Sequence, residues 1–293
     1  MDGPYSNEYL QKLRNARNPY DSEDFATLLG LKKEISESGD GVLYEMKRLY
    51  CLCAYLQRNR MQPQHEQDIV LAQFCAAYLP GTVDQFLDKC SPSGPLSGNT
   101  PMQLEIVLNN AYLEMLVYMQ YSPYFSKFLH SSPNGKQLSQ QFSERLAALG
   151  STWDRNISHP PRDRPDGYYE SVARSSVCLL STICAAFAKE TDHDSVISQV
   201  TRETLISLFT RWATLYKGEP LGEASFRAAR ILAHEPDIQE ATHRVRRHCK
   251  NWNVCGMPKC NKKTSLKACG RCQTVRYVSE LSLPHLFLCD LLE

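Results

Sequence analysis

Apolar residues recur at steps of three and four along most of the chain. One such series is Val42, Met46, Leu49, Cys53 and Leu56. Similar series run through residues 104–118, 172–187 and 205–216. This spacing places apolar side chains on one face of an α-helix, which can then be buried against neighbouring helices. No convincing alternation of apolar and polar residues is bounded by hairpin turn residues, so the pattern predicts an all-α protein.

Capping signals and breaks divide this helical pattern. Thr100 before Pro101, with Gln103 at the capping-box position, predicts a helix start, and residues 82–85 repeat the box without proline. A final helix is expected over residues 223–250, with a break at Pro236. Proline, glycine and serine gather in three segments that we expect to be loops. These segments are residues 91–101, 131–135 and 158–167.

Helices of about 15 to 25 residues joined by short polar loops are typical of an irregular helical bundle or an armadillo- or HEAT-like stack. We therefore expect a helical body over residues 1–250, with a subdivision near residues 158–167, and a small separate segment over residues 251–293. No fixed sequence period is visible. We predict that the helical body serves as a scaffold.

Composition excludes some classes of protein. Of 293 residues, 42% are hydrophobic and 22% are charged, which is ordinary globular usage and argues against wholesale disorder. The first residues show no basic start followed by an apolar core. The most apolar stretch, residues 177–188, is interrupted by Ser and Thr and is shorter than the roughly 18 residues that span a bilayer. We expect an intracellular protein, cytoplasmic, nuclear or both, with no membrane partner.

Charge is distributed unevenly along the chain. The net charge is +1, yet residues 241–279, here called the basic segment, contain ten Lys and Arg residues and no Asp or Glu. Residues 1–240 carry the other 23 basic residues against 29 acidic ones. The body is therefore acidic, with a net charge of about −6, and the basic segment is strongly cationic.

Cysteine is also clustered. Four of the twelve cysteines fall within 18 residues, where random placement would put about 0.7. The four are Cys255, Cys260, Cys269 and Cys272. Most of the others lie among apolar helix formers, where a free thiol acts as a small hydrophobic group. Without an export signal, metal ligation is favoured over a disulfide framework.

The spacing of these four thiols is typical of a zinc site. Two cysteines separated by two residues can face one ion, and Gly270 relieves crowding in the turn between them. Zinc binding of this kind supplies about 10–16 kcal/mol, enough to fold a segment that has no core of its own. We predict that Cys255, Cys260, Cys269 and Cys272 bind Zn²⁺. A redox Cys-x-x-Cys would need a thioredoxin-like βαβ setting, and unliganded surface thiols are the other alternative.

Residues 255–279 resemble the first two-thirds of a MYND-type zinc finger. Cys255 and Cys260 match the family's first cysteine pair, and Cys269 and Cys272 match the second. Leu266-Lys267 matches the spacer before the second pair, and Arg276-Tyr277 matches the approach to the fifth ligand. The resemblance implies zinc binding and contact with a protein or peptide partner, often one that contains proline. It therefore favours a non-enzymatic adaptor in transcriptional repression or signalling.

The chain departs from the family pattern after Tyr277. The fifth and sixth ligands would stand at Val278 and Ser282, whereas His285 and Cys289 reproduce the closing His-x3-Cys about five residues early. The family's groove residues after the sixth ligand are missing. In the family, pairs one and three share one zinc and pairs two and four the other. A second arrangement, with Cys269, Cys272, His285 and Cys289, thus stays open beside the single four-cysteine site.

A splicing hypothesis explains the same departure. A 5′ splice donor beginning GT-A-AGT, read in frame, encodes the Val-Ser found at Val278-Ser279. The residues up to Glu293 would then be intron read through to a stop codon, and the match at His285 and Cys289 would be accidental. Transcript sequencing tests this hypothesis.

Other residues have simpler interpretations. His243, His248 and Cys249 are reserve ligands, although the histidines fit better as solvated helical residues. An aromatic series fits core packing better than a peptide groove. Its members are Tyr112, Tyr118, Tyr121, Tyr124 and Phe125.

Two further function classes compete with an adaptor. A lysine methyltransferase that joins a SET domain to a MYND finger is disfavoured, because the Asn-His-Ser-Cys segment and cofactor glycines are missing. Acid–base pairs, phosphate loops and nucleophile elbows are not apparent either. The other alternative is a nucleic-acid-associated regulator that uses the basic segment, which predicts steep salt dependence.

Overall fold

The structure is a computed structural model, and it describes residues 21–32, 42–89, 105, 107–160, 167–187, 196–235, 238, 266–268 and 276–278. Most of these residues are helical, which confirms the all-α prediction for the described part of the chain. Two three-residue strands, β1 (Leu266–Ala268) and β2 (Arg276–Val278), are the exception among the described residues.

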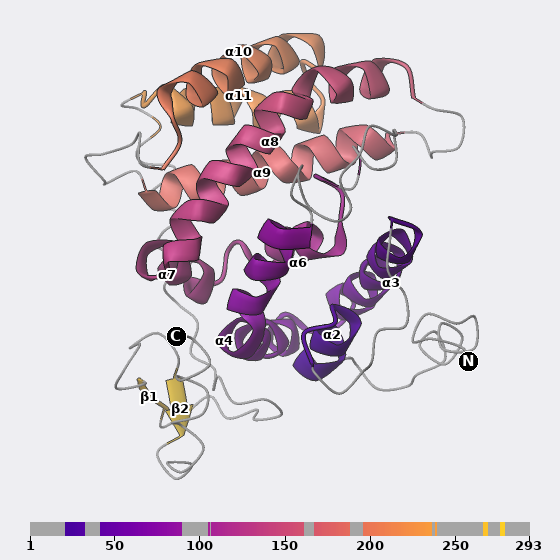
Figure 1. The fold of residues 1–293 in the computed structure, drawn as a ribbon, viewed down its shortest axis with the longest axis vertical. Helices are drawn as coiled ribbons and strands as arrows, with labels where there is room; N and C mark the ends of the chain where they lie inside the picture. Colours follow the sequence, from indigo (N-terminus) through magenta and orange to yellow (C-terminus); the bar gives the residue numbers. More distant parts are fainter. Residues whose placement is uncertain are drawn as a thin grey trace. The chain divides into compact units, whose positions relative to one another are not determined.

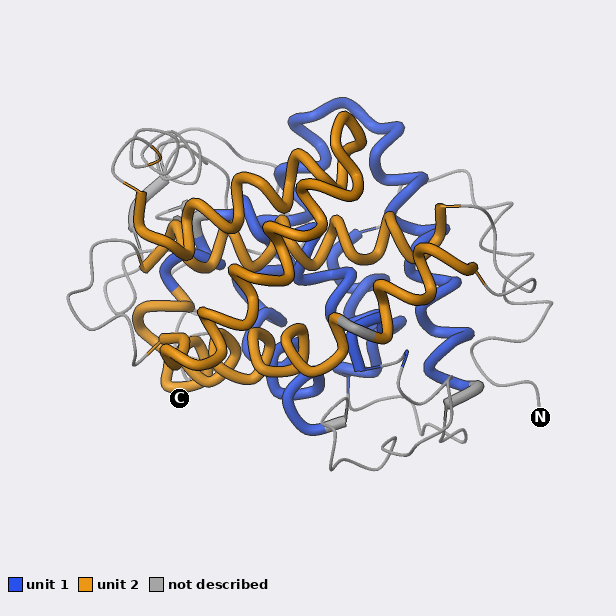
Figure 2. Tube along the Cα trace, turned by 90° about the horizontal axis from the view of Figure 1, so that it is seen from above, with its two compact units in different colours: residues 1–127, 250–293 blue, residues 128–249 orange. Residues whose placement is uncertain are grey.

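The chain divides into two compact units (Figure 2). Unit 1 combines residues 1–127 with residues 250–293, and unit 2 comprises residues 128–249. Residues 158–167 connect two helices of unit 2. The predicted boundaries, a body over residues 1–250 and a finger over residues 251–293, stay a prediction.

Unit 1 is built on two long helices. They are α3 (Val42–Arg60) and α4 (Gln64–Lys89), which contact one another (Figure 1). Both also contact α2 (Ser22–Leu28) and α6 (Ala111–Met119). Phe25 of α2 packs edge-on against Tyr55 of α3 and Phe74 of α4, with ring centroids 5.9 and 6.4 Å apart. These aromatic contacts fix the short α2, which is too short to be stable alone.

Unit 2 contains four longer helices after α7 (Pro123–Ser131), which crosses the unit boundary in sequence. They are α8 (Pro133–Ser158), α9 (Tyr168–Phe187), α10 (Gln199–Leu215) and α11 (Pro220–Leu232). The pairs α8–α9, α9–α11, α11–α10 and α10–α8 are all in contact, so the contacts close into a cycle. Leu205, Phe209 and Trp212 of α10 are buried there.

The sequence periodicity predicted several helices well. The predicted apolar faces of α9 and α10 are largely buried, whereas on α3 Leu49 and Leu56 are buried and Cys53 is exposed. The break at residues 158–167 falls between the end of α8 and the start of α9. The series in residues 104–118 corresponds to a helix that begins later, at Ala111. Asn110 caps it, because its side chain accepts a hydrogen bond from the Leu113 N–H at 2.8 Å. The start signal at Thr100 lies outside the described residues.

Two local predictions were wrong. Residues 82–85 do not start a helix, since α4 continues through Pro80 and the Thr82 hydroxyl donates to the Tyr78 carbonyl at 2.8 Å. Buried apolar residues on both sides of Pro80, such as Phe74 and Phe86, keep the helix in place. Residues 131–135 are not a loop, because α7 ends at Ser131 and α8 begins at Pro133, a favoured first helical position.

The last described helix ends just before the predicted break at Pro236. Helix α11 ends at Leu232, and His234 adopts a left-handed conformation with φ of 55°. The Glu235 N–H donates to the Arg230 carbonyl at 3.1 Å, and the His234 N–H donates to the Ile231 carbonyl at 3.1 Å. These are the bonds of a Schellman termination, so the helix stops before Pro236 is reached. Residues 239–250 lie outside the described residues.

Candidate metal-binding segment

A short antiparallel hairpin is what the structure describes of the C-terminal segment. Leu266, Lys267 and Ala268 of β1 have Val278, Tyr277 and Arg276 of β2 as their respective Cα partners. Residues 269–275 therefore connect two paired backbone positions, Ala268 and Arg276. This connecting segment contains Cys269 and Cys272, the Cys-x-x-Cys pair, in its sequence.

The predicted ligands themselves lie outside the described residues. All four cysteines of the cluster and all the reserve residues lie outside the described part of the chain. The predicted set is Cys255, Cys260, Cys269 and Cys272, and the reserve set is His243, His248, Cys249, His285 and Cys289. Zinc ligation by either set stays a prediction.

The described part of the chain offers no competing metal site. Among its residues, no group of three or more His, Cys, Asp or Glu side chains could hold a metal ion. Cys51 and Cys75 are buried free thiols, and burial raises their pKa values to about 11 and about 12. At neutral pH both are uncharged thiols, which are poor ligands and poor nucleophiles. They act as small core residues, as the sequence predicted.

A buried arginine joins three elements of unit 1. Arg48 of α3 is fully buried, and its Nη1 donates to the Leu29 carbonyl and, at 2.6 Å, to the Tyr112 hydroxyl of α6. Its Nε lies 3.4 Å from Oε2 of Glu45, one helical turn earlier. The guanidinium also lies 5.5 Å from the centre of the Tyr112 ring. This network is structural, and sequence reasoning missed it, although Glu45 and Arg48 are spaced for an i,i+3 ion pair.

The aromatic series around α6 belongs largely to the core. Tyr112, Tyr124 and Phe125 are buried. The hydroxyl of half-buried Tyr118 accepts a hydrogen bond from Asn59 Nδ2 at 2.8 Å. Tyr121 is exposed. Core packing is therefore confirmed for the three buried members, and they are not available to line a peptide groove.

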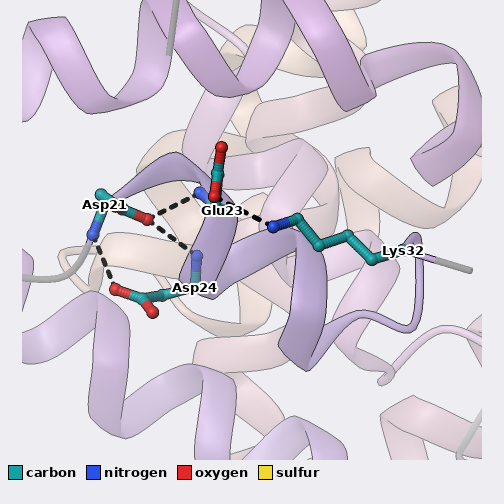
Figure 3. Close-up of polar contacts among 4 residues, drawn as sticks. All are labelled: Asp21, Glu23, Asp24 and Lys32. Atoms are coloured by element: carbon teal, nitrogen blue, oxygen red, sulfur yellow. Dashed lines mark hydrogen bonds and ion pairs between the residues drawn. The ribbon is translucent and has the colours of Figure 1, made fainter. Parts of the chain in front are cut away.

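The acidic residues at the start of α2 form a helix cap (Figure 3). The Asp21 carboxylate accepts hydrogen bonds from the N–H groups of Glu23 and Asp24, at 2.9 and 3.0 Å. Asp24 accepts a hydrogen bond from the Asp21 N–H, which completes a capping box. Glu23 pairs with Lys32 at 3.0 Å. These contacts account for the cluster without a bound cation.

Glu114 of α6 is a described carboxyl group with a shifted pKa. Burial raises its pKa, and the nearby Arg60 guanidinium opposes that shift. Another ionisable neighbour is the Cys53 thiol of α3, whose pKa burial and the Glu114 carboxylate raise to about 12, so this thiol stays protonated at neutral pH. We therefore assign Glu114 no catalytic role.

Helix α9 is long and apolar enough to cross a membrane by length and composition. Half of its most apolar window is buried inside the protein, and it contacts α8 and α11. The core helix of a soluble protein meets the same criteria, so the expected intracellular location stays a prediction.

Comparisons with known proteins add no relative. No family model, curated protein or solved structure matches the chain. The resemblance to a MYND-type finger thus rests on residues 255–279 alone.

Proposed function

We propose that this protein is a zinc-binding adaptor, in which a helical scaffold carries a small MYND-like finger at residues 251–293. The observation that carries the proposal is the clustering of four cysteines within 18 residues, at spacings that suit tetrahedral Zn²⁺. The antiparallel pairing of Ala268 with Arg276 supports it, because a hairpin closes the segment that contains the Cys-x-x-Cys pair. Cys255, Cys260, Cys269 and Cys272 are the proposed ligands of one ion.

The scaffold is proposed to be an irregular helical bundle. The closed cycle of contacts among the four long helices of unit 2 supports a bundle over an open armadillo- or HEAT-like stack, in which each layer contacts only its neighbours. The mostly helical described part also disfavours a β-rich methyltransferase domain. We infer a non-enzymatic, intracellular protein whose partner is a protein or peptide.

Zinc stoichiometry tests the metal site. Full-length protein purified without chelator is expected to contain about one zinc per chain by elemental analysis. The double variant Cys269→Ser/Cys272→Ser should lose the metal. The matched control is Cys53→Ser, which changes an exposed free thiol of α3 and should retain zinc. Zinc near zero in the unaltered chain, or full zinc in the double variant, would overturn the proposed site.

Peptide binding tests the adaptor function. An array of proline-containing peptides, probed with the full chain, is expected to yield peptides that bind only the zinc-loaded protein. Binding that survives in Cys269→Ser/Cys272→Ser would assign the contact to the helical body. An array with no zinc-dependent binder would contradict this class of partner.

A further inference from the structure

Helix α3 has an outward face with large exposed apolar side chains. The helix contacts α2, α4 and α6 (Figure 1), and its Leu49 and Leu56 are buried. Tyr50 and Met61, the residue directly after the last turn, are instead 57% and 80% exposed. Single exposed apolar residues are normal in proteins, so their arrangement along the helix decides whether they form a binding surface.

The exposed apolar residues belong to one stripe. Tyr50, Cys53 and Gln57 follow one another at steps of three and four, and Met46 and Met61 extend the series by four residues at each end. Cys53 and Gln57 are exposed, and Met46 is half-buried. At about 100° per residue, the five positions fall within about 80° of the helix circumference, along about 22 Å of its length. Together these five residues form the outer stripe of α3, whose spacing is typical of a seam along which a second helix packs.

Cations flank the outer stripe on both sides. Helix geometry places Lys47 and Arg58 along one side of the stripe and Arg60 along the other. Lys47 and Arg60 are exposed, and Arg58 is half-buried. Glu45 is the acidic residue of α3, and it is buried on the opposite face. The surface around the stripe on α3 is therefore cationic.

Arg60 is a positioned cation. Its guanidinium carbon lies 5.4 Å from the centre of the Tyr118 ring of α6. Glu114 of α6 lies near Arg60 and offsets part of its charge, so Lys47 and Arg58 on the other side contribute most of the remaining positive charge. A guanidinium held over a ring keeps its N–H donors available for a carboxylate.

We propose that the outer stripe of α3 binds an acidic amphipathic helix of a partner protein. The apolar seam of that helix covers Tyr50 and Met61, and Asp or Glu residues beside the seam face the flanking cations. Gln57, the polar position within the stripe, sets the register of the two helices. This contact is separate from the peptide contact proposed for the finger, because α3 contains none of the proposed zinc ligands.

Charge argues against a second copy of this chain as the occupant. Two α3 helices packed along their outer stripes, parallel or antiparallel, bring Lys47 and Arg58 of one copy close to the cations of the other. Such like-charge pairs oppose association. An acidic helix meets no such penalty, and its charge also accelerates association.

Fluorescence anisotropy with the full chain tests the proposal. The probe is a labelled helical peptide of about 21 residues, with Leu at heptad positions a and d and Glu at e and g, which keeps it from pairing with itself. The matched probe has Lys in place of each of those Glu residues. We expect the acidic peptide to bind at least about tenfold more tightly than the basic one. Polyglutamate, which has the charge without the apolar seam, should compete weakly.

Variants at exposed apolar positions locate the contact. Tyr50→Glu/Met61→Glu should weaken binding of the acidic peptide at least about tenfold, because it places charge in the seam and repels the probe. The matched control is Val200→Glu/Leu215→Glu, which changes residues of α10 that are 74% and 60% exposed. This control should bind the acidic peptide as the unaltered chain does.

A second variant leaves the apolar residues in place. Lys47→Glu/Arg60→Gln should weaken binding about threefold or more and reduce its salt dependence. The control Lys217→Glu/Arg227→Gln makes the same change in net charge at exposed positions of unit 2, and should leave binding unaltered. Circular dichroism of each variant checks that the helices are retained.

Several results would overturn the proposal. They are absence of binding by the acidic peptide, equal binding of the acidic and basic peptides, and equal losses in the stripe variants and their controls. Competition by polyglutamate or RNA as strong as by unlabelled peptide would assign this face to a polyanion. A dimer of the free chain that Tyr50→Glu/Met61→Glu abolishes would identify a second copy as the occupant.

The zinc-site variant separates this proposal from the function proposed above. Cys269→Ser/Cys272→Ser should bind the acidic helical peptide as the unaltered chain does. Loss of binding in that variant would place the contact at the finger and overturn the role of α3. Binding of the acidic peptide by a chain that contains no zinc would support the role of α3 and overturn only the metal site.

Discussion

The two compact units satisfy their buried polar groups in different ways. In unit 1, buried side chains bond across elements: Arg48 reaches Leu29 and Tyr112, and Asn59 bonds to Tyr118. In unit 2, buried hydroxyls mostly bond within their own helix, as Ser139 does to Gly135 and Ser143 to Gln140. Unit 1 therefore depends on several specific long-range bonds, whereas unit 2 depends mainly on apolar packing, with a long-range bond from Trp212 Nε1 to Asp154.

This difference has energetic consequences. A polar network in a low-dielectric core is costly when it is broken and sensitive to the charge of its members. Apolar packing responds instead to lost volume and is insensitive to pH. Changes in side-chain volume should therefore destabilise unit 2 most, and changes in buried charge should affect unit 1 most.

The largest effect is expected in the apolar core of unit 2. Trp212→Ala should lower the free energy of unfolding by about 3–5 kcal/mol, because it leaves a cavity. It also removes the hydrogen bond from Trp212 Nε1 to Asp154, 2.7 Å long. Urea unfolding followed by circular dichroism measures the loss. Leu215→Ala, at a 60% exposed position of the same helix, is the control and should change stability by less than about 0.5 kcal/mol. Similar losses in both variants would contradict a core at Trp212.

The network in unit 1 should respond to charge more than to volume. Arg48→Met keeps most of the side-chain volume but leaves Glu45 buried without its cation, and should cost about 3 kcal/mol. Adding Glu45→Leu should restore most of that loss, since an apolar pair has no charge to desolvate. Urea unfolding of both variants provides the measurement. A double variant no more stable than the single one would show that packing, and not charge, governs this site.

A pH dependence should arise from unit 1. Burial raises the pKa of Glu114 in the folded state above its ordinary value of 4.5. Its stabilising contribution is therefore complete below about pH 4.5 and is lost as pH rises through the folded-state pKa. Glu114→Gln removes this loss, so its stability relative to the unaltered chain should increase with pH.

Urea unfolding at a series of pH values from 4 to 8 measures this difference. Glu144→Gln, an exposed position of α8 in unit 2, is the control. Equal pH slopes for the two variants would refute the assignment to Glu114.

The smallest effect is expected at the end of α11. His234→Gly should stabilise the protein by about 1 kcal/mol, because glycine adopts the observed φ of 55° without a steric penalty. Ala233→Gly, at the right-handed cap position next to it, should be neutral or destabilising. Thermal unfolding distinguishes the two. A destabilised His234→Gly would mean that the histidine side chain contributes more than the backbone strain costs.

Helix periodicity was predictable where apolar burial dominates. The faces of α9 and α10 could be identified from spacing alone, because each of these helices buries an apolar stripe, whereas the buried face of α3 includes Glu45 and Arg48. The prediction failed where tertiary contacts override local signals. Pro80 does not end α4, and the segment around Gly135 is helical. Glycine at position 135 permits a close approach to the backbone of Leu129, which a side chain would prevent. Local composition contains no information about that close approach.

For the candidate site, the sequence is more informative than the described structure. The cysteine cluster and the basic segment are visible in the sequence without any structure, because metal ligation and charge depend on residue type and spacing. The pairing of residues 266–268 with 276–278 could not be predicted, since neither three-residue run alternates long enough to indicate a strand. The Arg48 network was missed for another reason, namely that its partners are 19 and 64 residues away in sequence.

The turn between α10 and α11 limits how this protein can be engineered. Gly218 has φ of 87°, and a side chain at Gly222 would meet the Tyr216 carbonyl. The four residues between the helices are thus constrained by Gly218 within the turn and by Gly222 in the first turn of α11. An epitope tag or a circularly permuted end placed there would separate the two helices, so fusions of this protein should be made elsewhere.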